Sequence, residues 1–520
     1  MPRDYIERYK GAFDKGWDVL REEYLKRQKS LGIVPQDAEL TERNRFVKPW
    51  EELSDKEKLL FAHYMEVYAG FLEHTDEQIG RVISYLEKQE ILDDTLIVLL
   101  SDNGASAEGG QDGTFVCERG MQLYSEPDDM EFAYSHMEEM GSEYSSQHYP
   151  IGWANLGNTP FSWYKSWVHA GGIRDPLIIR YPAGIPAPGG IRTQYCHVGD
   201  ITPTVLDILG IEKGESVFGR KQKPMHGTSL AYTFDNENAP TRKTIQYYEQ
   251  TGNRAIWKEG WKAVANHLLV DDYADDVWEL YDTENDFSEK NDLAGIYPEK
   301  LEELKQDWEK EAQKYGVYPL GYGAYVLRSE KQKEADKKRR ILAMKEEEFH
   351  FSHIVFPYRT GRQLALDGRN LTTEIEIDHS PDNEGTLYAL GTRFGGYTLY
   401  IKGNRLCYTY NSHIMEYFRI ASDPLPEDRL VLRCEIHVLD ENREKAVLFV
   451  NKKHAGETII TRLIHRGEIN FSIKDGYLTS VDPGNELPFE YPGEIIRMDV
   501  KVASYSISEE ELLTEFFHND

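Results

Sequence analysis

Apolar positions divide the chain into a part that mixes helices with strands and a later part of strands alone. Near the start, apolar residues recur every three or four positions, which predicts a helix with one buried face. These residues are Tyr9, Phe13, Trp17, Leu20 and Tyr24, and Gly32 is the predicted stop. Longer apolar periodicities predict two further helices, over residues 55–89 and 298–315.

Two short runs of consecutive apolar residues predict strands buried on both faces. They occupy residues 96–100 and 177–179, and each lacks the alternation of a half-exposed strand. Such runs are typical of a parallel sheet covered by helices. A helix predicted over residues 203–209 follows the second run. We therefore expect residues 1–325 to form one α/β domain.

The pattern changes after a segment of mixed charge, which we interpret as a solvated linker over residues 326–348. Beyond it, apolar and polar residues alternate with a period of two. Residues 397–401 and 406–410 flank a Lys-Gly-Asn-Arg turn, which predicts a β-hairpin. Many short strands separated by turn residues predict a β-sandwich over residues 349–520.

Composition and net charge limit the kinds of partner that the chain is expected to bind. The chain has 520 residues and a formal net charge of −30, so it repels phosphate backbones and we expect no nucleic-acid partner. Its densest apolar run has five residues, far short of the ~20 that cross a bilayer, so no membrane partner is expected. The chain opens without a signal peptide, which predicts a cytoplasmic location, although a signal on a missing amino-terminal segment stays open.

The strongest candidate for chemistry follows the first predicted strand. Asp102 and Asn103 stand at its carboxyl end, where open α/β sheets place their ligands. A carboxylate and an amide oxygen suit hard cations such as Ca²⁺ and Mg²⁺. An ordinary Asn-Gly turn, with Asp102 capping the next helix, is the structural alternative.

Motifs downstream resemble those of the sulfatase family, specifically the arylsulfatase type. They stand in the family's order over residues 1–320: Glu73–Gly80, Ser101–Gly104, Trp153–Phe161, Tyr164–Pro176, His197–Thr204 and Gly252–Ile256. The resemblance implies an alkaline-phosphatase-like α/β fold, here partial, in which a mixed sheet is flanked by helices. It implies a sulfuric ester hydrolase.

The resemblance also assigns roles to individual residues. Asp102 and Asn103 match the pair that ligates a divalent cation, usually Ca²⁺, with Mg²⁺ as the other option. Lys165, four residues before His169, matches a lysine that holds a sulfate oxygen, so it is the expected catalytic residue. Lys165 and Asn103 are the expected substrate-binding residues, and we interpret His169 as a packing residue.

The chain departs from the family at the nucleophile. Sulfatases use a formylglycine made within a C/S-x-P-x-R motif, and no cysteine or serine of this sequence stands in that context. The chain therefore resembles the carboxyl-terminal part of a sulfatase, with the formylglycine expected on a missing amino-terminal segment. We expect a sulfate-ester substrate, a separate amino-terminal half as a possible partner, and no activity of this chain alone.

Two other functions remain open from the sequence. One is a phosphoesterase or phosphonate hydrolase of the same superfamily. The other is a non-catalytic binding protein that uses the β-sandwich. Residues 349–520 loosely resemble the laminin-G or lectin-like domain of some long arylsulfatases, at Gly395–Tyr397 and Val481–Gly484. Both a structural role and carbohydrate binding are compatible with that likeness.

Overall fold

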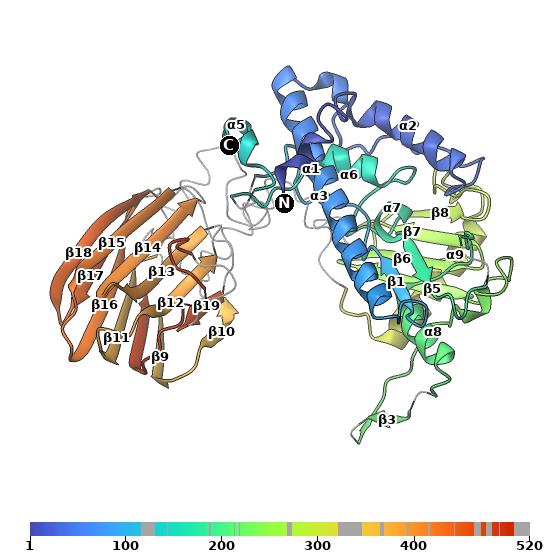
Figure 1. Cartoon of the computed structure of the whole chain (residues 1–520). Coiled ribbons are helices and arrows are strands. Elements are labelled where there is room, and N and C mark those ends of the chain that lie inside the picture. The colour runs from blue at the N-terminus through green and yellow to red at the C-terminus, as the bar shows by residue number, and fades with distance from the viewer. Residues whose placement is uncertain are drawn as a thin grey trace. The chain divides into compact units, whose positions relative to one another are not determined.

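The computed structural model divides the chain into two compact units (Figure 1). It describes residues 1–115, 130–142, 144–186, 189–212, 214–217, 219–267, 273–320, 346–363, 369–392, 395–413, 416–440, 443–461, 470–474, 481–487 and 489–503. The first unit comprises Met1–Asp112 and Tyr149–Arg328, and the second comprises Gly113–His148 and Ser329–Asp520. The predicted linker falls almost entirely outside the described residues.

The first unit begins with helices, but the predicted helix around residues 9–24 is interrupted. α1 (Arg3–Glu7) and α2 (Gly16–Ser30) are separated by turns. Gly11 within those turns and Gly16 at the start of α2 take left-handed φ values of 75° and 74°, which a continuous helix does not allow. A side chain at Gly16 would overlap the Trp50 ring, because its Cβ would lie 2.1 Å from Cγ. The apolar spacing correctly indicated residues that become buried, such as Phe13, Trp17 and Leu20, but the prediction of one continuous helix through them was wrong.

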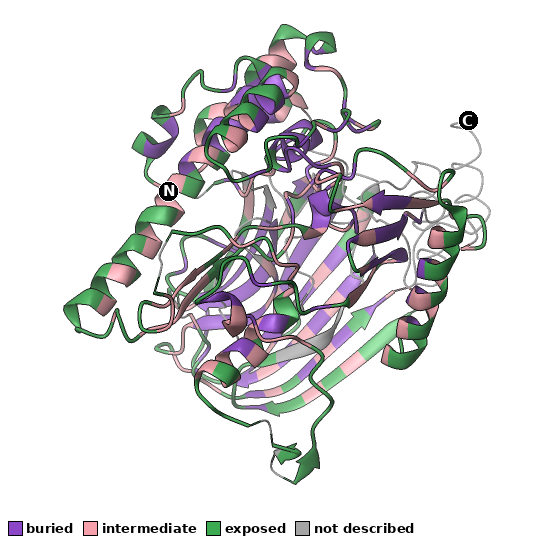
Figure 2. Ribbon diagram, turned by 90° about the vertical axis from the view of Figure 1, so that its right-hand side faces the viewer, coloured by how far each residue is buried: buried purple, intermediate pink, exposed green. Residues whose placement is uncertain are grey.

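The longest helix, α3 (Asp55–Lys88), confirms the second prediction. The Ser54 side chain accepts from the Glu57 backbone, and the Glu57 carboxylate accepts from the Ser54 backbone, which is a capping box. Buried residues occupy this helix only up to Gly70, where α1 packs closely against it. The remaining turns of α3 contain no buried residue (Figure 2). They carry exposed apolar side chains such as Phe71 and Val82.

The predicted parallel strands are the clearest correction. β1 (Ile97–Leu100) and β2 (Leu177–Arg180) pair antiparallel with each other and form a two-stranded sheet. Neither strand contains a buried residue, and Leu100 and Ile178 are exposed. The apolar run was found where expected, but no layer among the described residues covers it.

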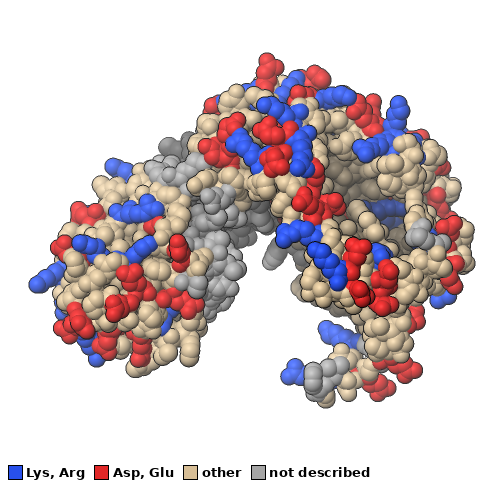
Figure 3. Space-filling view, viewed as in Figure 1, with Lys and Arg blue, Asp and Glu red and all other residues tan. Residues whose placement is uncertain are grey.

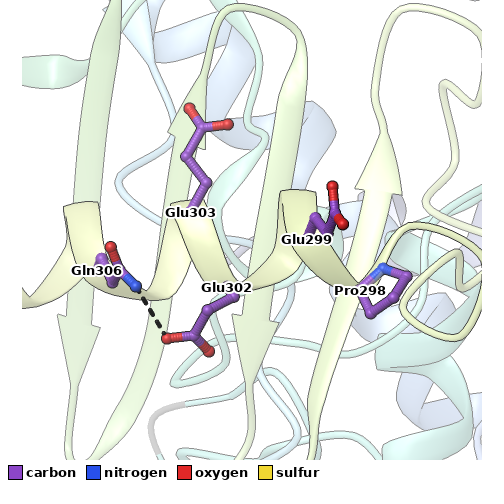
Figure 4. A pocket seen from close by; sticks show the side chains of 5 residues that line it. All are labelled: Pro298, Glu299, Glu302, Glu303 and Gln306. Carbon is purple, nitrogen blue, oxygen red and sulfur yellow. Dashed lines mark hydrogen bonds between the residues drawn. The ribbon is translucent and has the colours of Figure 1, made fainter.

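A four-stranded antiparallel sheet anchors the rest of this unit. It contains β5 (Ile245–Gln250), β6 (Asn253–Lys258), β7 (Trp261–Ala265) and β8 (Trp278–Asp282) in sequential order. The predicted helix α9 (Pro298–Tyr315) crosses one face of the sheet and buries Leu304 and Trp308 there. Its outward face borders a hollow of about 490 Å³ lined by Pro298, Glu299, Glu302, Glu303 and Gln306 (Figure 4).

Shorter elements complete the first unit. They are η1 (Trp50–Glu52), α6 (Ile151–Gly157), α7 (Ala170–Ile173), η3 (Val198–Asp200), α8 (Ile201–Ile208), β3 (Ser216–Val217), β4 (Arg220–Lys221) and η4 (Ala231–Thr233). Helix α8 agrees with the prediction over residues 203–209.

The second unit contains two six-stranded antiparallel sheets around one apolar core. The first has the order β10 (Tyr358–Gln363), β19 (Asn470–Ile473), β12 (Gly385–Thr392), β13 (Gly395–Lys402), β14 (Arg405–His413), β15 (Glu416–Pro424). The second has the order β18 (Lys453–Thr461), β17 (Arg443–Val450), β16 (Arg429–Asp440), β11 (Leu371–Asp378), β20 (Ile495–Val502), β9 (Glu347–Ile354). Short helices α5 (Met130–Ser135) and η2 (Met137–Glu139) are also assigned to this unit.

The hairpin predicted at the Lys-Gly-Asn-Arg turn is confirmed. Strands β13 and β14 pair from Lys402 and Arg405 outward, and Gly403 and Asn404 both have the positive φ that a tight hairpin turn requires.

Acidic and basic side chains are interspersed on the face of the molecule seen in Figure 3. No helix among the described residues has the length and apolar composition of a membrane span.

Candidate functional site

The structure brings the two predicted chemical motifs into one place. Asp102–Asn103 lies in the loop after β1, and two backbone hydrogen bonds tie that loop to the segment that carries Lys165. The Gly104 amide donates to the Gly172 carbonyl at 3.1 Å, and the Lys165 amide donates to the Ala105 carbonyl at 3.1 Å. Segments about 60 residues apart in sequence therefore form one backbone framework.

This framework requires glycine at three positions because the chains approach so closely. A Cβ at Gly104 would lie 1.8 Å from the Gly171 carbonyl oxygen. A Cβ at Gly171 would lie 2.2 Å from the Ser162 oxygen, and one at Gly172 would lie 2.1 Å from the Trp167 oxygen. Each of these contacts is with backbone, which cannot move aside as a side chain can. A larger residue at Gly104 would thus separate the two loops, and one at Gly171 or Gly172 would distort the segment that carries Lys165, because Ser162 and Trp167 belong to that segment.

Asn158 connects the two loops through its side chain. Its Oδ1 accepts from the Ala105 amide at 2.8 Å, and its Nδ2 donates to the Trp163 carbonyl at 2.9 Å. The side chain is buried, so water cannot replace these partners without a change in packing. One amide thereby holds the loop after Asp102–Asn103 and the loop before Lys165.

The four-stranded sheet β5–β8 packs against the Lys165 loop, the segment around Lys165 that includes Ser166 and Val168. The Asn253 Nδ2 on β6 donates to the Ser166 carbonyl at 2.9 Å. Val168 packs against Ala255 and Val264, on the sheet face opposite the α9 core. Lys165 therefore projects from a loop fixed to a layered core.

His169 lies beneath the same loop as a packing residue. It is 2 % exposed, and its Nε2 lies 2.6 Å from the Glu279 Oε2, which also accepts from the Tyr281 hydroxyl at 2.7 Å. The Ala170 amide, next along the chain, donates to the Glu289 carboxylate at 2.8 Å. These contacts fix the start of α7.

Lys165 forms an ion pair with Glu108. Its Nζ lies 3.0 Å from both carboxylate oxygens, and the two side chains are 34 % and 22 % exposed. The Ser106 hydroxyl donates to the same carboxylate at 3.0 Å. The ammonium group is thus half-buried, reachable by a ligand, and paired with a carboxylate.

Carboxylates also gather around Asp102. Asp102 is exposed, and Asp175 lies near enough for burial and the Asp102 charge to raise the Asp175 pKa to about 7. The Asn103 Nδ2 donates to the Gly104 carbonyl at 3.0 Å, which leaves its amide oxygen for a ligand. A divalent cation would relieve the repulsion between the two carboxylates, so these residues fit such an ion. The described residues contain no group of three or more His, Cys, Asp or Glu side chains arranged around a common point.

The sequence pointed to some of these residues and missed others. Asp102, Asn103 and Lys165 were predicted, and the structure places their loops together; their roles stay predictions. Glu108, Asp175 and Asn158 were not predicted as parts of the site. Their spacing along the chain carries no signal, because each acts through a partner that only the fold brings near.

Two family models match the chain between residues 1 and 315. The model described as "Sulfatase" matches residues 1–211, and the model described as "N-sulphoglucosamine sulphohydrolase, C-terminal" matches residues 160–315. Both ranges contain the Lys165 loop, and the first contains Asp102–Asn103.

Curated relatives agree with these matches. An uncharacterized sulfatase of Schizosaccharomyces pombe is 35 % identical over 59 % of this chain and 54 % of its own length. An arylsulfatase of Klebsiella aerogenes is 31 % identical over 44 % of this chain and 47 % of its own length. The chain spans about half the length of these relatives.

Among solved structures, one from work on glycosaminoglycan metabolism by Bacteroides thetaiotaomicron aligns with 57 % of this chain and 54 % of its own. The sequence identity is 17 % and the TM-score is 0.33.

We predict that Asn158→Ala loosens both loops of the site. The change leaves the Ala105 amide and the Trp163 carbonyl without their partner, which should cost about 1–3 kcal/mol of unfolding free energy. Hydrogen exchange at Ala105 should accelerate in parallel. Asn155→Ala is the matched control, because Asn155 is buried in α6, the helix that Asn158 caps, and its amide atoms have no hydrogen-bond partner among the described residues. Equal effects of the two changes would contradict the assignment.

A second prediction concerns pH. The Asp175 pKa is raised to about 7 in the fold, above the ~3.9 of an unfolded chain. The folded state thus resists ionisation, so the free energy of unfolding should fall as pH rises from about 4 to 7. Asp175→Asn should remove this part of the pH dependence in denaturant titrations without added cation. The exposed Asp94→Asn change serves as the control, and an unchanged pH profile in Asp175→Asn would contradict the shift.

Proposed function

Because residues 1–315 belong to the sulfatase family, we propose that this chain supplies the carboxyl-terminal part of a sulfate-ester hydrolase of the arylsulfatase type. One observation carries the proposal. The oxygen ligands of Asp102–Asn103 and the ammonium group of Lys165 stand on loops that share backbone hydrogen bonds. The named relatives are sulfatases, so the phosphoesterase alternative is not favoured.

Each residue has a distinct role in this proposal. Lys165 binds a sulfate oxygen and stabilises the negative charge that grows there as the ester bond breaks. Asp102 and Asn103 hold Ca²⁺, or Mg²⁺, which supplies further positive charge at the sulfate when bound. These two residues offer about three oxygens of the six to eight that Ca²⁺ takes. The remaining ligands come from water, from substrate or from protein outside this chain.

The nucleophile also comes from outside the printed residues. No C/S-x-P-x-R motif is present, so the formylglycine belongs to another segment, joined to this chain or supplied as a separate half. Charge stabilisation by Lys165 cannot replace that covalent step.

The uncovered β1–β2 sheet is the proposed contact for that missing half. Among the described residues each strand pairs only with the other, and Leu99, Leu100 and Ile178 are 41 %, 38 % and 58 % exposed. An open strand edge with apolar side chains favours the addition of further strands. About half of each curated relative has no counterpart in this chain, which is enough protein to cover the surface.

The second unit is proposed as a laminin-G-like or lectin-like sandwich appended to the sulfatase part. Its two six-stranded antiparallel sheets support a sandwich. A binding role for it, with or without catalysis by the first unit, remains the alternative function.

The proposed function predicts that Lys165→Ala lowers kcat/KM on an aryl sulfate by about 10²–10³ in an enzyme completed with the missing half. Lys165→Arg should restore activity only partly, since a planar guanidinium does not replace a compact ammonium. Asp102→Ala should cost more, because it also weakens cation binding.

The control for that experiment is Lys258→Ala, a lysine paired with Glu303 and Asp307 on the far side of the sheet. It should leave kcat/KM within a few-fold of the parent. A completed enzyme in which Lys165→Ala behaves like Lys258→Ala would remove Lys165 from the site.

The proposed contact makes its own prediction. In the 520-residue chain alone, backbone amides of β1 and β2 should undergo hydrogen exchange at least about tenfold faster than those of β6 and β7, because β1 and β2 form an uncovered pair. Fusion to the part of a matched sulfatase that this chain lacks should slow exchange at β1 and β2 and leave β6 and β7 unchanged. Equal protection before fusion, or none gained after it, would refute the contact.

A further inference from the structure

Glu108 stands directly against the lysine that the proposed function assigns to sulfate. Both of its oxygens lie 3.0 Å from the Lys165 Nζ, so the ammonium charge is largely neutralised before any ligand arrives. The carboxylate is held in place by a local turn. Ser106 donates its hydroxyl to Glu108, and the Ser106 oxygen accepts from the Glu108 amide at 3.2 Å.

We propose that Glu108 is a specificity-determining residue, which makes the site select singly charged sulfate esters over doubly charged phosphate esters. This inference rests on the proposed function, in which an oxygen of the substrate anion sits at Lys165. Any such anion comes to lie beside the Glu108 carboxylate as well. The carboxylate repels every anion, but it repels a dianion twice as strongly as a monoanion at the same place.

The two classes of ester differ in charge under ordinary conditions. A phosphate monoester carries about −1.5 to −2 at pH 7, because its second pKa is near 6. A sulfate monoester has no second proton to lose and carries a single negative charge. The two groups have nearly the same tetrahedral shape, so hydrogen bonds alone separate them poorly. A fixed carboxylate separates them by charge.

A purely positioning role for Glu108 predicts a different result. A glutamate that only orients Lys165 would aid anion binding, so its loss would weaken binding of both esters. The Glu108→Gln variant distinguishes the two roles, because the amide oxygen still accepts a hydrogen bond from Lys165 while the negative charge is gone. Selectivity by charge predicts that Glu108→Gln binds both esters more tightly, with a larger gain for the phosphate ester.

The experiment measures binding of phenyl sulfate and phenyl phosphate to the full chain at pH 8. Chemical shifts of ¹³C-labelled lysine side chains report binding, and Lys165→Ala assigns the Lys165 signal. We expect Glu108→Gln to strengthen phenyl sulfate binding about tenfold and phenyl phosphate binding about a hundredfold, the square of the first factor. At pH 5, where phenyl phosphate carries close to one charge, the two gains should converge.

The matched control is Glu303→Gln on α9 (Figure 4), which makes the same change in net charge at an ion pair with Lys258 of β6. It should leave both affinities unchanged. Equal gains for the two esters at pH 8, weaker binding of both, or no binding to Glu108→Gln would each overturn the inference. Phenyl sulfate binding that shifts other lysines and survives Lys165→Ala would instead refute the proposed role of Lys165.

Discussion

The candidate site depends on one constraint, the close approach of the backbone after β1 to the backbone around Lys165. That approach is possible only because Gly104 has no Cβ, since its nearest neighbour is the Gly171 carbonyl. Gly171 and Gly172 allow equally close packing within the Lys165 segment, against the Ser162 and Trp167 carbonyls. Asn158 then satisfies a donor on one loop and an acceptor on the other. The side chains with chemistry are attached to this framework but contribute little to it. Residues that take no part in the proposed chemistry, three glycines and the buried Asn158, therefore determine the positions of Asp102–Asn103 and Lys165.

Local periodicity predicted the helices well and their continuity less well. The α3 and α9 helices follow from apolar spacing together with a capping box in one case and an amino-terminal proline in the other. The same spacing spans residues 9–24, yet the chain breaks there at Gly11 and Gly16. Spacing reports which residues share a buried side. It does not report whether the backbone between them stays helical, because a glycine in the left-handed region can carry the same apolar face through a turn.

Strand orientation was beyond the sequence for a different reason. A run of apolar residues such as 96–100 indicates that the strand must be buried against other segments. It does not identify which segments pack against it. The structure pairs β1 antiparallel with β2 and leaves apolar side chains of both exposed. In contrast, β6 is buried along most of its length, because α9 covers one side of its sheet and Val168 the other. The contrast between the two sheets within one unit shows that burial depends on the available layers and not on the strand alone.

The charges at the site follow from tertiary placement, which explains why resemblance indicated Asp102, Asn103 and Lys165 but not their neighbours. Glu108 and Asp175 enter only once the loops meet: Glu108 pairs with Lys165, and Asp175 lies near enough to Asp102 for the Asp102 charge to raise the Asp175 pKa. An ester anion at Lys165 meets an ammonium group that is already paired with a carboxylate. Positive charge added nearby, by a divalent cation at Asp102–Asn103 or by basic groups of the missing half, would strengthen its binding. Cation binding and substrate binding are thus coupled in the proposed enzyme, because the cation adds charge that the Glu108 carboxylate has neutralised at Lys165.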